Sequence, residues 1–85
     1  MRILYFSWLR EVIKKSEDIF SKDEVSEIKT VKELVSFLMS KGSPYNEAFN
    51  DVKNIKVSVD REFVSMDSDV KADSEVAFFP PVTGG

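Results

Sequence analysis

The sequence predicts a single α+β domain in which a mixed sheet packs against one main helix. Its 85 residues leave no room for a second core. Strand-like segments near both ends bracket helical segments, without the repeating strand–helix–strand units of a parallel α/β fold. Hydrophobic residues make up 42% of the chain, which is too high for a disordered segment and ordinary for a globular domain.

The chain is expected to begin with a strand over residues 2–6. This segment is rich in β-branched and aromatic side chains. Because side chains alternate along a strand, Ile3 and Tyr5 should lie on one face, with Leu4 and Phe6 on the other.

A short helix is expected next, because Ser7 can act as its N-cap and Leu9, Val12 and Ile13 share one helical face. Residues 19–25 follow. We interpret them as a poor, polar strand that returns along an edge of the sheet.

The main helix is predicted to begin at a capping box. Thr30 and Glu33 stand three residues apart, so the Thr side chain can accept a backbone N–H while the Glu side chain reaches back. Apolar residues follow at i, i+3, i+4 and i+7, and Gly42 is expected at the C′ position. The apolar positions are Val31, Leu34, Val35 and Leu38.

The second half of the chain is predicted to contain a short helix and three strands. Residues 43–52 have helical spacing after a proline, which predicts a short helix with a structured loop as the alternative. Residues 55–59 alternate as a strand, and a tight turn at Asp60 and Arg61 leads into the next one, although neither residue is Gly or Asn. The final strand should cover residues 76–79.

Composition argues against several classes of function. The formal net charge is −3, without a basic stripe that would bind nucleic acid. The chain has no Cys and no His, so it lacks a thiol nucleophile, the usual general base and the commonest metal ligands. No apolar run approaches the roughly 20 residues of a membrane span, and no signal-peptide cleavage site follows the apolar start. We expect a cytoplasmic protein with no metal, no bound cofactor, and neither nucleic acid nor membrane as partner.

The sequence closes on six residues that are expected to project as a tail. Two prolines stop the last strand, because proline donates no ladder hydrogen bond. Two glycines leave the final carboxylate without a nearby side chain, so the segment can enter a narrow site on another protein. We therefore divide the chain into a domain, residues 1–79, and a tail, residues 80–85. The tail is Pro80, Pro81, Val82, Thr83, Gly84 and Gly85.

The carboxylate of Gly85 is the best candidate for a reactive group. Joined to a nucleotide phosphate, it would gain a leaving group that a sulfur or nitrogen nucleophile can displace. The chain has no phosphate-binding loop of the G-x-x-x-x-G-K-[ST] type, so a partner must supply the nucleotide site. Since Cys is absent, any carried sulfur must sit at the terminus as a thiocarboxylate.

The two ends of the chain closely resemble the small subunit of molybdopterin synthase. The similar stretches are the sequence FFPPVTGG (residues 78–85) after the strand residues 75–77, and the opening ILYF (residues 3–6) followed by LRE (residues 9–11). The hairpin at residues 59–64 also falls where that family has one. The resemblance covers the whole chain in order and length, and it implies a β-grasp, ubiquitin-like fold.

The same resemblance implies a sulfur carrier that is not catalytic by itself. An E1-like enzyme would use ATP to adenylate Gly85, and a sulfur donor system would convert it to a thiocarboxylate. The carrier would dock on a large subunit that holds the catalytic residues, in a heterotetramer of two small and two large subunits. There it would give sulfur to cyclic pyranopterin monophosphate. Partner-binding positions carried over from the family are an apolar surface of Phe6, Phe63 and Phe79, a basic position at Arg10, and the tail from Pro80 through Pro81, Val82 and Thr83.

Three other functions stay open from the sequence. A ubiquitin-like modifier that forms isopeptides with lysines would use the same Gly-Gly ending, and so would a thiamine-type sulfur carrier. The third is a passive β-grasp interaction domain. The phenylalanines of the docking surface could equally be core, but alternation puts Phe78 and Phe79 on opposite faces of the last strand, so one of them lies away from the main helix.

Overall fold

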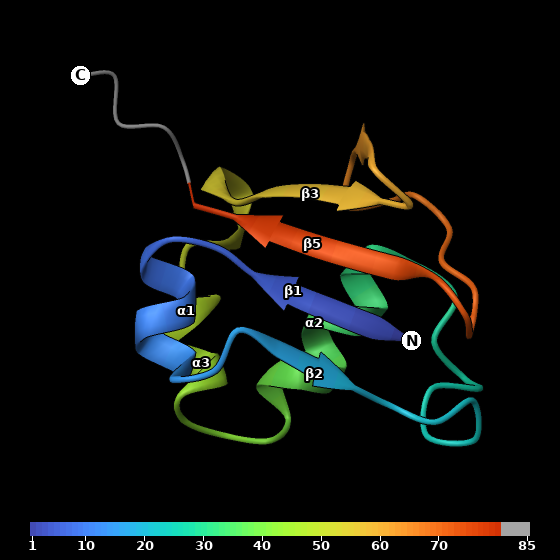
Figure 1. Cartoon of the computed structure of the whole chain (residues 1–85), viewed down its shortest axis with the longest axis horizontal. Coiled ribbons are helices and arrows are strands. Elements are labelled where there is room, and N and C mark those ends of the chain that lie inside the picture. The colour runs from blue at the N-terminus through green and yellow to red at the C-terminus, as the bar shows by residue number, and fades with distance from the viewer. Residues whose placement is uncertain (81–85) are drawn as a thin grey trace.

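A five-stranded mixed sheet forms the centre of the computed structural model, which describes residues 1–80. The strands lie in the order β2-β1-β5-β3-β4, so the C-terminal strand β5 is central (Figure 1). β5 is parallel to β1, and the other neighbouring pairs are antiparallel. The predicted α+β class with a mixed sheet is confirmed. The strands are β1 (Arg2–Tyr5), β2 (Glu17–Ile19), β3 (Lys56–Val59), β4 (Glu62–Val64) and β5 (Glu75–Phe79).

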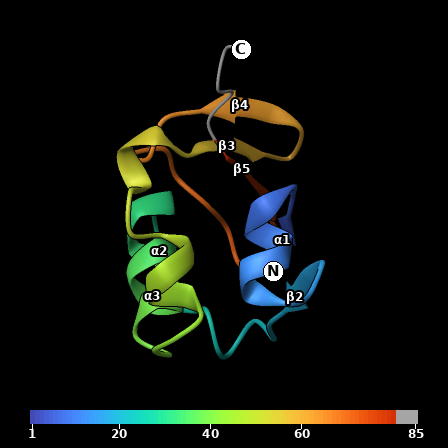
Figure 2. The same cartoon turned by 90° about the vertical axis from the view of Figure 1, so that its left-hand side faces the viewer.

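Helices cover one face of this sheet and leave the other face open. Figure 2 shows α2 (Val31–Met39) and α3 (Tyr45–Ala48) together on one side of the sheet. The helix α1 (Trp8–Ile13) follows β1, and the short 3₁₀ helix η1 (Val52–Asn54) precedes β3. The covered face and the helices share one apolar cluster, which includes Ile3, Tyr5, Leu34, Leu38, Phe49, Val57, Val76 and Phe78.

The main helix begins where the sequence predicts. The backbone N–H of Glu33 donates to Thr30 Oγ1 at 3.2 Å, as a capping box requires. The Glu33 carboxylate accepts from the backbone N–H of Lys29 at 2.7 Å, one residue further back than a standard box. Helix α2 ends at Met39, and the left-handed Gly42 stands two residues after the C-cap Ser40 rather than one.

The turn between β3 and β4 adopts a left-handed conformation without glycine. Asp60 has φ 49° and Arg61 has φ 73°, the signs that a type I′ hairpin turn needs at its two central residues. Asp60 is also tied to β5, because its Oδ1 accepts from the N–H of Glu75 at 3.0 Å and its own N–H donates to the Glu75 carbonyl at 2.8 Å. These bonds help to offset the cost of φ > 0 at a residue with a Cβ.

Two further local predictions are wrong. The return strand covers Glu17–Ile19 instead of residues 19–25. Ser21 and Glu24 bond each other through side chain and backbone at 2.9 and 3.2 Å, which closes the following segment into turns. Ser7 precedes α1 with φ 53° and makes no side-chain capping bond.

The predicted boundary after residue 79 coincides with the end of β5, and residues 81–85 of the predicted tail lie outside the described residues.

Asp18 is the polar centre that joins β2 to α3. Its Oδ2 accepts from the hydroxyls of Tyr5 at 2.8 Å and Tyr45 at 2.6 Å, and its Oδ1 pairs with Lys15 Nζ at 2.9 Å. The Asp18 side chain is only 12% exposed. Burial alone would raise the pKa of its carboxyl, but the hydrogen bonds from Tyr45, Lys15 and Tyr5 outweigh burial and hold the pKa below its ordinary value.

We expect Asp18→Asn to destabilise the domain by about 2 kcal/mol, because hydrogen bonds to a charged acceptor are worth about 1.5–3 kcal/mol. Urea or thermal unfolding at neutral pH measures this loss. In the wild type the contribution is present above the unfolded pKa of Asp18 and is lost as the pH falls through its lowered folded pKa, below about pH 4. The acid limb of the stability curve should therefore be flatter in the variant.

The matched control for this prediction is Asp73→Asn. Asp73 is exposed, and its side chain makes no hydrogen bond or ion pair within the described part of the chain. Equal unfolding midpoints for the two variants would show that the Asp18 cluster contributes nothing to stability.

Candidate functional site

Three phenylalanine rings meet on the open face of the sheet. The rings of Phe6 and Phe79 stack with centroids 4.7 Å apart, and Phe63 lies against Phe79 at 5.5 Å. Phe6 is 37% exposed and Phe63 is 72% exposed, while Phe79 between them is half-buried. The structure thus brings together the three residues that the sequence assigned to an apolar surface. We refer to Phe6, Phe63 and Phe79 as the aromatic cluster.

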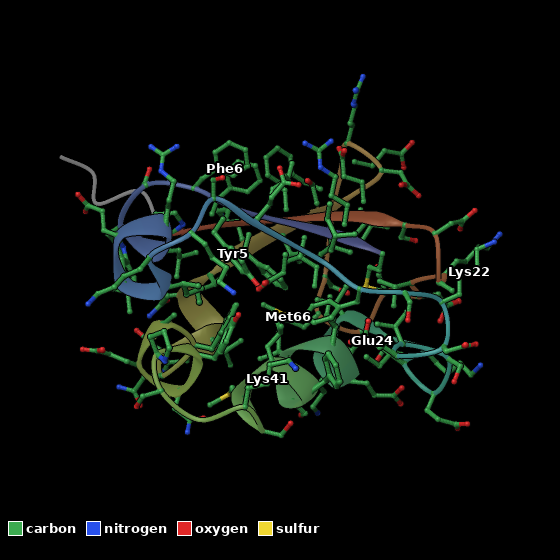
Figure 3. All side chains as sticks on the ribbon, turned by 60° about the horizontal axis from the view of Figure 1, so that its bottom comes forward. Tyr5, Phe6, Lys22, Glu24, Lys41 and Met66 are labelled. Carbon is green, nitrogen blue, oxygen red and sulfur yellow. The ribbon has the colours of Figure 1, made fainter. Side chains whose placement is uncertain are left out.

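Strand register explains why these distant residues meet. Tyr5 pairs with Phe78 in the parallel β1–β5 ladder, and both side chains enter the core. Their successors Phe6 and Phe79 therefore lie side by side on the opposite face. Figure 3 shows this alternation at Tyr5, which points toward the helices, and Phe6, which points away from them. Phe78 is fully buried and Phe79 is not, as alternation predicts.

Phe63 reaches the cluster from the far edge of the sheet. It pairs with Ser58 of β3, and Ser58 pairs in turn with Ala77 of β5, so these residues form one row on the open face. Phe79 lies one row further toward the end of β5, within reach of the Phe63 ring. Ser58 and Ala77 are buried beneath this layer of side chains.

The tail begins at the aromatic cluster. Phe79 is the last residue of β5, and Pro80 follows it directly in a half-buried position. The remaining predicted tail residues, Pro81, Val82, Thr83, Gly84 and Gly85, lie outside the described residues. A protein that covers the cluster would therefore lie next to the start of the segment that carries the candidate reactive carboxylate.

Two charged groups lie at opposite ends of the open face, and a third charged residue lies on α1. At the start of β1 and β5, Arg2 pairs with Glu17 at 3.2 Å and with Glu75 at 3.4 Å, and the hydrogen bond to Glu17 raises the pKa of Arg2. Lys56 pairs in register with Phe79 at the other end of the face. Arg10, the predicted basic position, is exposed on α1, and its side chain makes no hydrogen bond or ion pair within residues 1–80.

Sequence reasoning missed Lys56. The alternation of Ile55, Val57 and Val59 placed its side chain on the opposite face from the core, but nothing local says which strand lies next to β3. The pairing of β3 with β5 joins residues about 20 positions apart, and this pairing puts Lys56 beside Phe79. The missing information is long-range register, which a hydrophobic pattern does not encode.

Features of other functional classes are not found in the described region. Residues 1–80 contain no group of three or more His, Cys, Asp or Glu side chains placed to hold a metal ion. None of the helices found there has the length and apolar character needed to cross a membrane.

Comparison with known sequences gives matches over nearly the whole chain. The profile of the ThiS family matches residues 3–85. A molybdopterin synthase sulfur carrier subunit from Haemophilus influenzae is 33% identical over 85 residues, covering 100% of this chain and 99% of that protein. The subunit of the same name from Escherichia coli is 29% identical, with the same coverage.

Solved structures share the fold. SAMP1 from Haloferax volcanii superposes with a TM-score of 0.69 at 23% identity and covers 100% of this chain and 98% of that one. A putative molybdopterin converting factor, subunit 1, from Pyrococcus furiosus gives 0.71 at 21% identity, with 95% of both chains covered. At these identities the likeness establishes fold alone, and the predicted β-grasp, ubiquitin-like fold is confirmed.

Proposed function

The chain belongs to the ThiS family, and from this membership we propose that it is the sulfur-carrier small subunit of a molybdopterin synthase. The observation that carries the proposal is the end-to-end match to two proteins named as sulfur carrier subunits of that enzyme. The matched region of the family extends to Gly85, so it includes the ending that the chemistry needs.

The proposed chemistry takes place at Gly85. Its carboxylate oxygen attacks the α-phosphate of ATP in an E1-like enzyme, which forms an acyl adenylate and releases pyrophosphate. Hydrosulfide supplied by a donor system then attacks the acyl carbon and displaces AMP, and the product is a thiocarboxylate. On the large subunit this group gives its sulfur to cyclic pyranopterin monophosphate, and hydrolysis returns the carboxylate. Catalytic side chains belong to the partners, and we place these steps in the cytoplasm.

The open face supports a carrier that works by docking. The rings of Phe63 on β4, Phe79 on β5 and Phe6 just after β1 form one apolar surface that is partly exposed, which is the kind of surface that marks a protein interaction site. Because Pro80 leaves the cluster directly, docking there would hold the start of the tail against the partner. The six residues from Pro80 can span at most about 20 Å when extended, which is enough to reach a buried site nearby.

The test is mass spectrometry of the intact chain. Incubation with an E1-like adenylating enzyme, ATP and a sulfur donor should replace one oxygen of the chain by sulfur, and omission of ATP should prevent the change. The loaded chain, mixed with the large subunit and cyclic pyranopterin monophosphate, should lose the added mass as the dithiolene product forms.

Other outcomes of the same reaction identify the alternatives. Transfer of the loaded sulfur to a thiamine precursor, and not to the pterin, would indicate a thiamine-type carrier. Recovery of Gly85 in isopeptide bonds to lysines of other proteins, without a thiocarboxylate intermediate, would indicate a modifier. If the chain is never adenylated, the passive interaction domain is the one alternative that remains.

A further inference from the structure

Lys56 is an exposed cation in the row of the aromatic cluster. Its backbone pairs with Phe79 in the β3–β5 ladder, and residues paired in this way place their side chains on the same face. The next residue, Val57, points into the core and is 3% exposed, so Lys56 points to the open face. Within residues 1–80 no carboxylate pairs with Lys56.

A group of side chains with the opposite net charge lies at the other end of the open face. There Arg2 pairs with both Glu17 and Glu75, so these three side chains together have one more carboxylate than cations. Lys56 lies in the same row as Phe79 at the tail end of the face, and Phe63 lies one row further in. Along the strands the face therefore changes from a row with an ammonium and aromatic rings to the group of Arg2, Glu17 and Glu75.

Covering the aromatic cluster would also cover Lys56. Withdrawing an ammonium from water is costly unless an opposite charge replaces the lost hydration. An all-apolar partner surface would leave this cost uncompensated, whereas a carboxylate beside the pocket for Phe79 would offset it. A complementary arrangement of charge also fixes the orientation of docking, since the reversed orientation places like charges together.

We propose that Lys56 forms an ion pair with an Asp or Glu side chain of the protein that docks on the aromatic cluster, and that it thereby helps to select that partner. The inference rests on the proposed function, because it takes the docked protein to be the large subunit of the synthase. It specifies that partner's surface as an apolar pocket with an acidic residue close to where the tail enters.

The experiment measures the affinity of the full chain for the large subunit by calorimetry at low and high salt. Lys56→Glu should weaken binding about 30-fold or more, because it removes the cation from a covered charge pair and places a second carboxylate beside the partner's. Lys56→Gln should weaken it less. The loss caused by Lys56→Glu should shrink at high salt, which screens the new repulsion.

Lys32→Glu is the matched control. It makes the same change of charge at an exposed position of α2, a helix on the covered side of the sheet. Near wild-type affinity for this variant, together with the loss for Lys56→Glu, supports the pair. Equal losses in both variants would mean that only net charge matters, and wild-type affinity for Lys56→Glu would mean that no pair forms. Either result overturns the inference while the proposed function stands. Failure of the wild-type chain itself to bind the large subunit would overturn both.

Discussion

Removal of Gly84 and Gly85 should abolish sulfur transfer and leave the domain folded. The shortened chain ends instead at the carboxylate of Thr83, which reaches about 7 Å less far and has a β-branched side chain next to the reacting carbonyl, so product formation should fall below detection. Stability should be unchanged, because both residues lie beyond β5, which ends at Phe79. Product formation by the reconstituted synthase and thermal unfolding of the isolated chain measure the two effects.

The control for the deletion is Thr83→Ala, which changes the tail without shortening it. This variant should still be adenylated and loaded with sulfur, because the reacting carboxylate and both glycines remain. Product formation by the shortened chain at the wild-type rate would mean that Gly85 does not carry the sulfur, and the proposed function would then fail.

Substitution of Phe79 by Asp separates docking from folding. A carboxylate in the middle of the aromatic cluster opposes any apolar pocket, so affinity for the large subunit should fall about 30-fold or more, which is the loss expected at an interface hot spot. The domain should stay folded, because Phe79 lies on the open face and its contacts are with Phe6 and Phe63. Calorimetric binding and circular dichroism on the same sample test both expectations.

The neighbouring position provides the contrast. Phe78 is fully buried and packs edge-to-face on Phe49 at 5.0 Å, so Phe78→Ala should destabilise the domain by about 3–5 kcal/mol. Unfolding by Phe79→Asp to the same extent would show that Phe79 is part of the core and would remove the argument for a docking face.

Local sequence rules predicted those features of the fold that depend on nearby residues. Alternation assigned Phe78 and Phe79 to opposite faces, and the capping box located the first turn of α2. The return strand was misplaced for a physical reason. Its central residue, Asp18, is a carboxylate that points toward the helices, which no hydrophobic pattern would suggest. Its burial depends on hydroxyls from Tyr5 and from Tyr45, which is 27 residues away.

In the candidate site, too, one part could be predicted from the sequence and another part could not. Family resemblance identified the aromatic cluster because its three positions match a known surface. Lys56 has no such signal, since its role depends on which strand lies next to β3. Residues 56 and 79 pair across a long loop, and the sequence near either residue does not predict such a long-range pairing.

The central position of β5 has a consequence for how the chain is made. β5 lies between β1 and β3, so the sheet lacks its central strand until residue 79 has left the ribosome. A chain released early lacks the central strand and exposes its apolar face to chaperones and proteases. Chains that are cut off before β5 should therefore be removed in the cell as misfolded proteins.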